Sequence, residues 1–313
     1  MELGNIQSIH NYIAIIIANV FKSHPLQPDL IETVVRKLLL GNNLDEIVFL
    51  SECSENQNTI FTIINGDLLQ NIQGSDEEKL LIQKLQDNEF KFLEKLLKDR
   101  KDPSLRKNAI NSGIIEALHY IFTTRDMDEI TYPHFLAFFQ FTWPYSAEMS
   151  KILVDKKSFD FLLRLLDHKN LNIINESLNA MVNIIYGGTL GLDESQVHPY
   201  YEDLTQAGGI EKIYSLFKRN LSRHSQNSAA ICLGIAFKSR IITDENMKLE
   251  IITHLKSISY RSDDEVNLAL RCLAQNLDNH VEIVKEESAI DVSDNDDDKN
   301  KNEEKKEIQC LIQ

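Results

Sequence analysis

The feature that most constrains this chain is an internal repeat of apolar stripes. Three segments carry aliphatic and aromatic residues spaced three and four apart, as one face of a helix requires. The first and third segments follow a glycine, at Gly113 and Gly209. The first apolar residues of the three segments are Ile114, Phe159 and Ile210. The steps between these residues are 45 and 51, and the longer step contains an apparent insertion at 187–199.

A further helix follows each stripe after a polar turn. These helices are expected at 135–142, 174–186 and 228–237, and a fourth unit starts near Met247 and reaches Leu277. A unit of this size cannot bury its apolar face alone, so successive units must stack on each other. The repeat therefore predicts a continuous core with an extended concave surface.

The remaining sequence also favours helices. Gly (11) and Pro (6) are scarce for 313 residues, and no alternating stretch is bounded by hairpin turns. Stripes at 30–39 and 80–97 have helical spacing. The apolar run 12–21 lacks a basic flank and is too short to span a bilayer, so we expect a buried helix there.

Several phrases resemble the armadillo-repeat family. Residues 111–118 (NSGIIEAL) and 206–213 (QAGGIEKI) are similar to the start of its second helix, and 178–185 (LNAMVNII) and 269–277 (ALRCLAQNL) to its third helix. The resemblance implies an all-α armadillo-like α-solenoid. We divide the chain into degenerate helical repeats at 1–107, armadillo-like repeats at 108–280, and a disordered acidic tail at 281–313.

The resemblance also implies a protein-binding groove. In armadillo proteins an Asn at the position of Asn183 hydrogen-bonds the backbone of an extended peptide. Gly234 and Gln275 occupy the equivalent places, so the regular Trp–Asn ladder of nuclear-import adaptors is missing. Asn183 and Gln275 are candidate groove residues. The residue type alone does not decide between this role and a second interpretation, in which Asn183 is a solvated side chain or one that lies between helices.

Aromatic residues supply two more candidates. Trp143 and Tyr145 flank a proline that ends the stretch 132–145, and Trp and Tyr often dominate interface energies. For the stretch as a whole, a core between repeats is the favoured interpretation. Trp143 and Tyr145 are the best candidates within it for exposed anchors of a partner.

The charge of the chain restricts its partners. The formal net charge is −15, which repels nucleic acid phosphates and anionic membranes and attracts basic proteins. We therefore expect a protein partner with a basic or extended segment, and no nucleic acid. Solubility alone is the other explanation of the charge.

No motif for catalysis or for a cofactor is present. The only glycine cluster, 187–191, lacks a phosphate-binding Lys, and no two of the nine His lie within five residues of each other. Cys53, Cys232 and Cys272 lie in apolar patterns and indicate reduced core thiols in a cytoplasmic or nuclear protein. We predict no enzyme, no cofactor and no metal. An enzyme with dispersed catalytic residues stays an alternative.

The C-terminal residues carry two candidate modification sites. Cys310-Leu311-Ile312-Gln313 fits the C-a-a-X box, with a Gln that favours farnesylation of Cys310. Ser293 precedes acidic residues, as acidophilic kinases prefer. Membrane contact is expected only if Cys310 is prenylated. That contact should be reversible or assisted by a partner, because a single lipid anchors weakly without a basic patch.

These observations predict a non-catalytic scaffold or adaptor that binds proteins through its groove. An importin-alpha-like adaptor for basic nuclear-import signals and a farnesylated peripheral membrane adaptor are the alternatives.

Overall fold

The computed structural model describes residues 2–22, 24–100, 103–259 and 264–285, with side chains from residue 11 onward. Every regular element in these ranges is a helix, and none is a β-strand. The predicted all-α class is therefore confirmed for the described part of the chain. The helices belong to two compact units, which we call unit 1 (Met1–Pro144) and unit 2 (Tyr145–Gln313).

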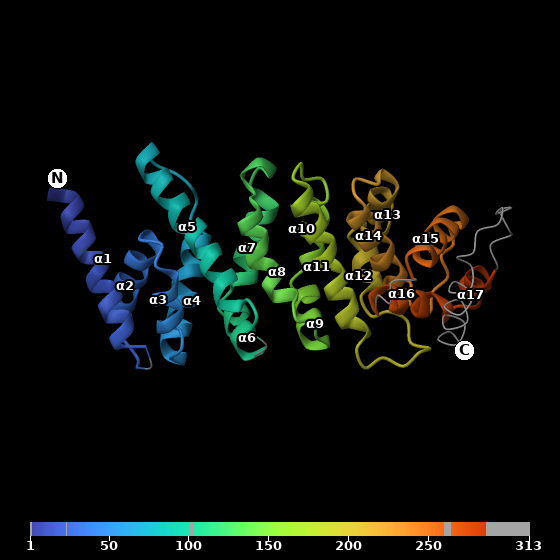
Figure 1. Ribbon diagram of the computed structural model, residues 1–313, viewed down its shortest axis with the longest axis horizontal. Helices are drawn as coiled ribbons and strands as arrows, with labels where there is room; N and C mark the ends of the chain where they lie inside the picture. The colour runs from blue at the N-terminus through green and yellow to red at the C-terminus, as the bar shows by residue number, and fades with distance from the viewer. Residues whose placement is uncertain (1, 23, 101–102, 260–263, 286–313) are drawn as a thin grey trace, which may run out of the picture. The chain divides into compact units, whose positions relative to one another are not determined.

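Unit 1 is centred on one long helix, whose start is fixed by a capping box. Ser75 N donates to Glu78 Oε2 (2.7 Å) and Glu78 N donates to Ser75 Oγ (3.3 Å). The helices are α1 (Glu2–Val20), α2 (Pro28–Leu40), α3 (Leu44–Leu50), α4 (Ser54–Leu68), α5 (Asp76–Leu97), α6 (Pro103–Asn111), α7 (Ile114–Thr124) and α8 (Tyr132–Thr142), with a 3₁₀ turn at Met127–Glu129. The long helix α5 packs against α2, α3, α4 and α8 (Figure 1).

The described part of unit 2 contains two successive groups of three helices, each ending in its longest helix, followed by three further helices. Its helices are α9 (Ala147–Asp155), α10 (Ser158–Leu165), α11 (Leu171–Thr189), α12 (Tyr201–Gln206), α13 (Gly209–Arg219), α14 (Arg223–Ala236), α15 (Glu245–Ile258), α16 (Asp264–Ala274) and α17 (Leu277–Val284). The helices expected at 174–186 and 228–237 correspond to α11 and α14. Ser293 and Cys310 lie outside the described residues.

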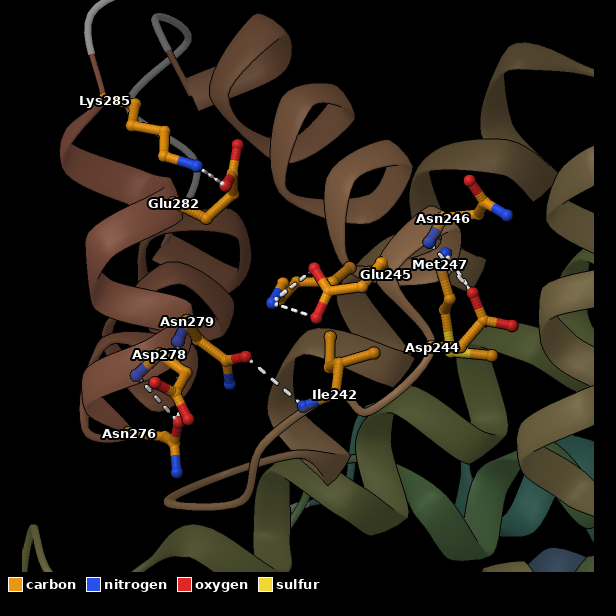
Figure 2. A network of polar contacts seen from close by, with 11 residues as sticks. Ile242, Asp244, Glu245, Asn246, Met247, Asn276, Asp278, Asn279, Glu282 and Lys285 are labelled. Atoms are coloured by element: carbon orange, nitrogen blue, oxygen red, sulfur yellow. Dashed lines mark hydrogen bonds and ion pairs between the residues drawn. The ribbon is translucent and has the colours of Figure 1, made fainter.

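The last helices of unit 2 are joined by side-chain hydrogen bonds to the backbone. Asn279 is fully buried; its Oδ1 accepts from Ile242 N (3.3 Å) and its Nδ2 donates to Arg240 O (2.7 Å). Asp244 and Asn276 cap the starts of α15 and α17 by accepting backbone N–H bonds (Figure 2). Because these bonds link the loop before α15 to α17, the helix α17 is part of the folded unit up to Val284.

The turn before the second helix of each repeat has one backbone conformation. The residue preceding α7, α10 and α13 is left-handed: Gly113 has φ 88°, Lys157 has φ 57° and Gly208 has φ 72°. At Gly113 and Gly208, glycine adopts this positive φ without a steric cost. Lys157 meets the same requirement with a side chain, which is sterically unfavourable in this region.

The N-terminal helix differs from its prediction. The run 12–21 is helical, but only one side of it is buried, at Ala14 and Ala18, while Tyr12, Ile13, Ile16 and Val20 are exposed. The expectation of a buried helix was therefore wrong for most of its apolar residues. The physical reason is that α1 packs on α2 and α3 with a narrow small-residue face. No helix in the described ranges is long and apolar enough to cross a membrane.

A buried acidic side chain lies in the core of unit 1. Glu89 on α5 has no solvent exposure, and Asp67 on α4 is nearly buried. Arg36 on α2 donates to Asp67 Oδ2 (2.5 Å) and to Glu32 Oε1 (3.1 Å). Burial, and secondarily the neighbouring Asp67, raise the pKa of Glu89 well above its usual value. Burial therefore favours the protonated, neutral form of the Glu89 carboxyl in the folded chain.

The left-handed turns generate a prediction about stability. Lys157→Gly should raise the unfolding free energy by about 0.5–1 kcal/mol, because it removes the strain of a side chain at positive φ. Gly208→Ala should lower it by about 1 kcal/mol, and its added Cβ meets no atom within 4 Å, so the effect is one of backbone conformation. Urea unfolding followed by far-UV circular dichroism measures both. Shifts of the same sign for the two variants would contradict the argument.

Glu89 generates a second prediction. Since its pKa is raised in the folded state, the folded chain holds more protons than the unfolded chain, and the unfolding free energy falls as pH rises above 4.5 towards the raised value. Glu89→Gln should remove this contribution, whose slope is at most about 1.4 kcal/mol per pH unit. Urea unfolding at several pH values, followed by the fluorescence of the single Trp, Trp143 in unit 1, measures the slope.

The matched control for Glu89→Gln is Glu77→Gln, an exposed carboxyl on the same helix. It should leave the pH slope as in the unsubstituted chain. An unchanged slope in Glu89→Gln would show that Glu89 is ionised in the folded state, contrary to the argument.

Candidate protein-binding site

Three helices of unit 2 lie side by side in the order α11, α14 and α16. Small residues let them approach closely: a Cβ placed on Gly234 of α14 would lie 2.8 Å from Ala269 Cβ on α16. A Cβ on Gly187 of α11 would similarly lie 2.9 Å from Ser146 O. The glycine at the place equivalent to Asn183 thus serves helix packing, because any side chain there would separate α14 from α16.

A row of amides runs along α11. Asn175, Asn179 and Asn183 are four residues apart and therefore lie on one face of the helix. Asn179 Oδ1 accepts from Ser228 Oγ (3.1 Å) and lies 3.1 Å from His224 Nε2, both on α14. Asn175 Oδ1 accepts from Ser222 Oγ (3.4 Å). Two of the three amides therefore connect α11 to α14.

Asn183, the predicted groove residue, is the third amide of this row. It is only 6% exposed. One turn further along α11, Tyr186 is half-buried and shares the same face. Between Asn183 and Gly188, Tyr186 is the residue of α11 that is more than marginally exposed.

Tyr145 and Tyr186 form an aromatic pair at the start of unit 2. Their ring centroids are 4.1 Å apart with an interplanar angle of 37°. Burial raises the pKa of Tyr145 to about 12, with further contributions from the Tyr186 hydroxyl and from the negative charges of Glu265 and Asp264. The two carboxylates at the start of α16 therefore act electrostatically on Tyr145.

This arrangement has the chemistry of a cation-binding surface. The faces of tyrosine rings attract ammonium and guanidinium groups, and carboxylates at the rim add Coulomb attraction. Asp264 is exposed and Glu265 is half-buried, so both remain near solvent. We call Asn183, Tyr145, Tyr186, Asp264 and Glu265 the tyrosine–carboxylate surface.

Gln275, the other predicted groove amide, has a structural role in this fold. Its Oε1 accepts from Lys238 Nζ (2.7 Å) and from Ser239 Oγ (3.0 Å). Lys238 Nζ also lies within 2.9 Å of three backbone carbonyls of the insertion, those of Asp193, Glu194 and Gln196. Lys238 is 4% exposed, and its desolvation lowers its pKa. Lys238 therefore fastens the insertion to the ends of α14 and α16.

Trp143, the predicted aromatic anchor, belongs to unit 1. Its side chain is about half-exposed, and its carbonyl accepts from Arg106 Nη2 (2.8 Å). Arg106 Nε also donates to Gln140 O (2.7 Å), so this buried arginine caps the end of α8. Trp143 is thus exposed as predicted, while Tyr145 lies in unit 2 beside Tyr186.

Sequence reasoning missed three residues of the tyrosine–carboxylate surface. Tyr186 stands three residues after Asn183, and this i,i+3 spacing was the signal for a shared face. Asp264 and Glu265 are the first two residues of α16, but their proximity to Tyr145 depends on tertiary packing. No local pattern connects residues so far apart in sequence.

The thiols and metal-binding groups give no chemistry of their own. Burial raises the pKa of Cys232 to about 12 and that of Cys272 to about 11, so neither is a thiolate near neutral pH. Within the described ranges, no three His, Cys, Asp or Glu side chains are grouped as a metal site.

Comparison with known proteins defines the fold class. No protein-family model and no curated protein matches the chain. Among solved structures, one engineered protein has 18% sequence identity and a TM-score of 0.52, and the match covers 84% of this chain and 95% of the engineered chain. A second engineered protein has 17% identity and a TM-score of 0.56, and the match covers 87% of this chain and 60% of the engineered chain. A designed armadillo repeat protein in complex with the peptide (KR)4 is 14% identical over 80% and 98% (TM-score 0.52).

These similarities show the fold: the chain is an armadillo-like repeat α-solenoid. The resemblance inferred from the glycine and asparagine phrases is thereby confirmed at the level of fold.

The hydrogen bonds from Lys238 to the insertion generate a prediction. Lys238→Met keeps most of the stem but removes the ammonium donor that three carbonyls and the Gln275 amide oxygen share, so the unfolding free energy should fall by about 3 kcal/mol. Hydrogen exchange in peptides covering 190–200 should accelerate at least ~10-fold. Lys212→Met, which removes an exposed ion pair with Asp167, is the control and should cost less than about 1 kcal/mol. Unchanged exchange at 190–200 would refute the assignment.

Proposed function

We propose that the chain is a non-catalytic protein-binding scaffold that binds a basic, extended segment of a partner on the tyrosine–carboxylate surface. The observation that carries this proposal is the Tyr145–Tyr186 pair under the negative charges of Glu265 and Asp264. Lysine or arginine side chains complement this chemistry through cation–π and ionic contacts.

The charge of the whole chain supports the same class of partner. A net charge of −15 accelerates the approach of a basic segment and disfavours nucleic acids. The designed armadillo repeat protein solved with the peptide (KR)4 is an example of this fold with a basic peptide. That likeness concerns the fold, so the peptide serves here only as a chemical probe.

An adaptor for basic nuclear-import signals is the second candidate, since it would use the same acidic and aromatic chemistry. Two features weaken it. Gly234 packs against α16, and Gln275 Oε1 is occupied by Lys238 and Ser239, so neither extends an amide row from Asn183. Cytoplasmic or nuclear localisation and farnesylation of Cys310 remain proposals from the sequence, and Cys310 would be the point of membrane contact.

Peptide binding to the full chain tests the proposal. The double substitution Asp264→Asn with Glu265→Gln should weaken binding of fluorescently labelled (KR)4 about tenfold, because each lost carboxylate removes roughly 0.5–1 kcal/mol of attraction. The difference should shrink as salt is added, since exposed charges are screened. Fluorescence anisotropy titration measures both effects.

The control carries the same change in net charge elsewhere in unit 2. Asp203→Asn with Glu211→Gln alters two exposed carboxylates on α12 and α13 and should leave the affinity within about twofold of the unsubstituted chain. Equal weakening by both double variants would mean that (KR)4 responds to overall charge, and the assigned surface would be rejected.

A further inference from the structure

The N-terminal helix α1 exposes an apolar stripe that no described element of unit 1 covers. Tyr12, Ile13, Ile16 and Val20 are each between 48% and 65% exposed. Large aliphatic side chains are normally among the most buried in a protein. A contiguous patch of this kind marks an interaction surface.

The spacing of the stripe indicates what covers it. Ile13, Ile16 and Val20 follow one another at steps of three and four, and in the sequence the same steps continue upstream through Ile9 and Ile6. Alternating steps of three and four are the a/d pattern of a helix that pairs lengthwise with another helix. We call Ile13, Ile16 and Val20, with Tyr12 beside them, the α1 seam.

The charge around the seam restricts the identity of the other helix. No Asp, Glu, Lys or Arg occurs from Leu3 to Phe21, although the chain as a whole carries −15. Two copies of this chain repel each other over most of their surface, and the repulsion is weakest where α1 meets α1. A strongly charged partner finds no complement there. A membrane surface is disfavoured because its amphipathic helices carry Lys and Arg on the polar face.

We propose that the α1 seam pairs with the α1 seam of a second copy of this chain. Ile13 stands at the middle of the three-and-four pattern that the sequence carries from position 6 to position 20, so Ile13 meets Ile13 when two such patterns align, whether the two helices run parallel or antiparallel. The same patch is used on both copies, which gives a closed, two-fold dimer. This inference is independent of the tyrosine–carboxylate surface.

A second apolar stripe exists on α17 and provides the competing arrangement. Leu277, Val281 and Val284 are exposed, but charged Asp278 and Glu282 lie within this short helix. Docking of α17 of one copy on α1 of another would use different patches and would build open chains of copies. The size distribution in solution separates the two arrangements.

The test is the mass of the full chain by light scattering after size-exclusion chromatography, from low micromolar to about 100 μM. The expected particle has twice the 36.0 kDa chain mass. Ile13→Glu and Ile16→Glu should each raise the dimer dissociation constant at least ~100-fold, because each places a carboxylate at an apolar helix seam. Leu277→Glu introduces the same charge at an exposed leucine on α17 and should leave the dimer intact.

Mixing two oppositely charged variants provides a second test, whose expected result a folding defect could not produce. Ile13→Glu and Ile13→Lys should each be monomeric alone, and an equimolar mixture should recover the dimer, because opposite charges then meet at the centre of the seam. Circular dichroism of each variant confirms that its helices are intact.

Four results would overturn the proposal. They are a monomer over the whole concentration range, a dimer that survives Ile13→Glu and Ile16→Glu, a series of larger particles abolished by Leu277→Glu, and loss of the dimer without recovery on mixing. Binding of the monomer to phosphatidylcholine vesicles, lost in Ile16→Glu, would assign the seam to a lipid surface instead.

Discussion

The structure depends on one constraint: each group of short helices leaves an apolar face that only the next group covers. In unit 2 this burial occurs where α11, α14 and α16 lie against each other, and glycine and alanine on α14 set how closely they approach. In unit 1 the long helix α5 has the same function against α2, α4 and α8. At α1 the series of covered faces stops within the described residues, and the exposed seam is the direct consequence.

The part of the fold that depends on local chemistry was predictable from the sequence. Apolar stripes and polar turns located the helices of the later repeats, and Gly113 and Gly208 marked the left-handed turns before α7 and α13. Lys157 was not predictable, because nothing in its residue type announces positive φ. The repeat itself imposes that conformation, and the cost of roughly 1–2 kcal/mol is small beside the burial of a whole repeat.

The candidate site was less predictable, because its residues acquire their roles through tertiary contacts. Asn183 and Tyr145 were named from family phrases and exposure rules, whereas Tyr186, Asp264 and Glu265 join them only once α11, α14 and α16 are stacked in that order. Trp143 was named on the same grounds as Tyr145 but belongs to unit 1. Two residues that flank one proline can therefore belong to different compact units, and spacing in sequence does not reveal this.

The amide side chains of unit 2 show why an armadillo-like chain need not keep a regular ladder for peptides. An amide that bonds a neighbouring helix contributes stability only while its partners stay in place, as with Asn179 beside Ser228 and His224. Gln275 is committed in the same way by Lys238, a buried ammonium that would otherwise lack a side-chain acceptor. Once amides are used to hold helices and the insertion together, recognition must come from other groups. Rings and carboxylates are suited to this role because they bind cations without requiring a fixed backbone register, so a surface built from them selects a partner by its charge more than by its exact sequence.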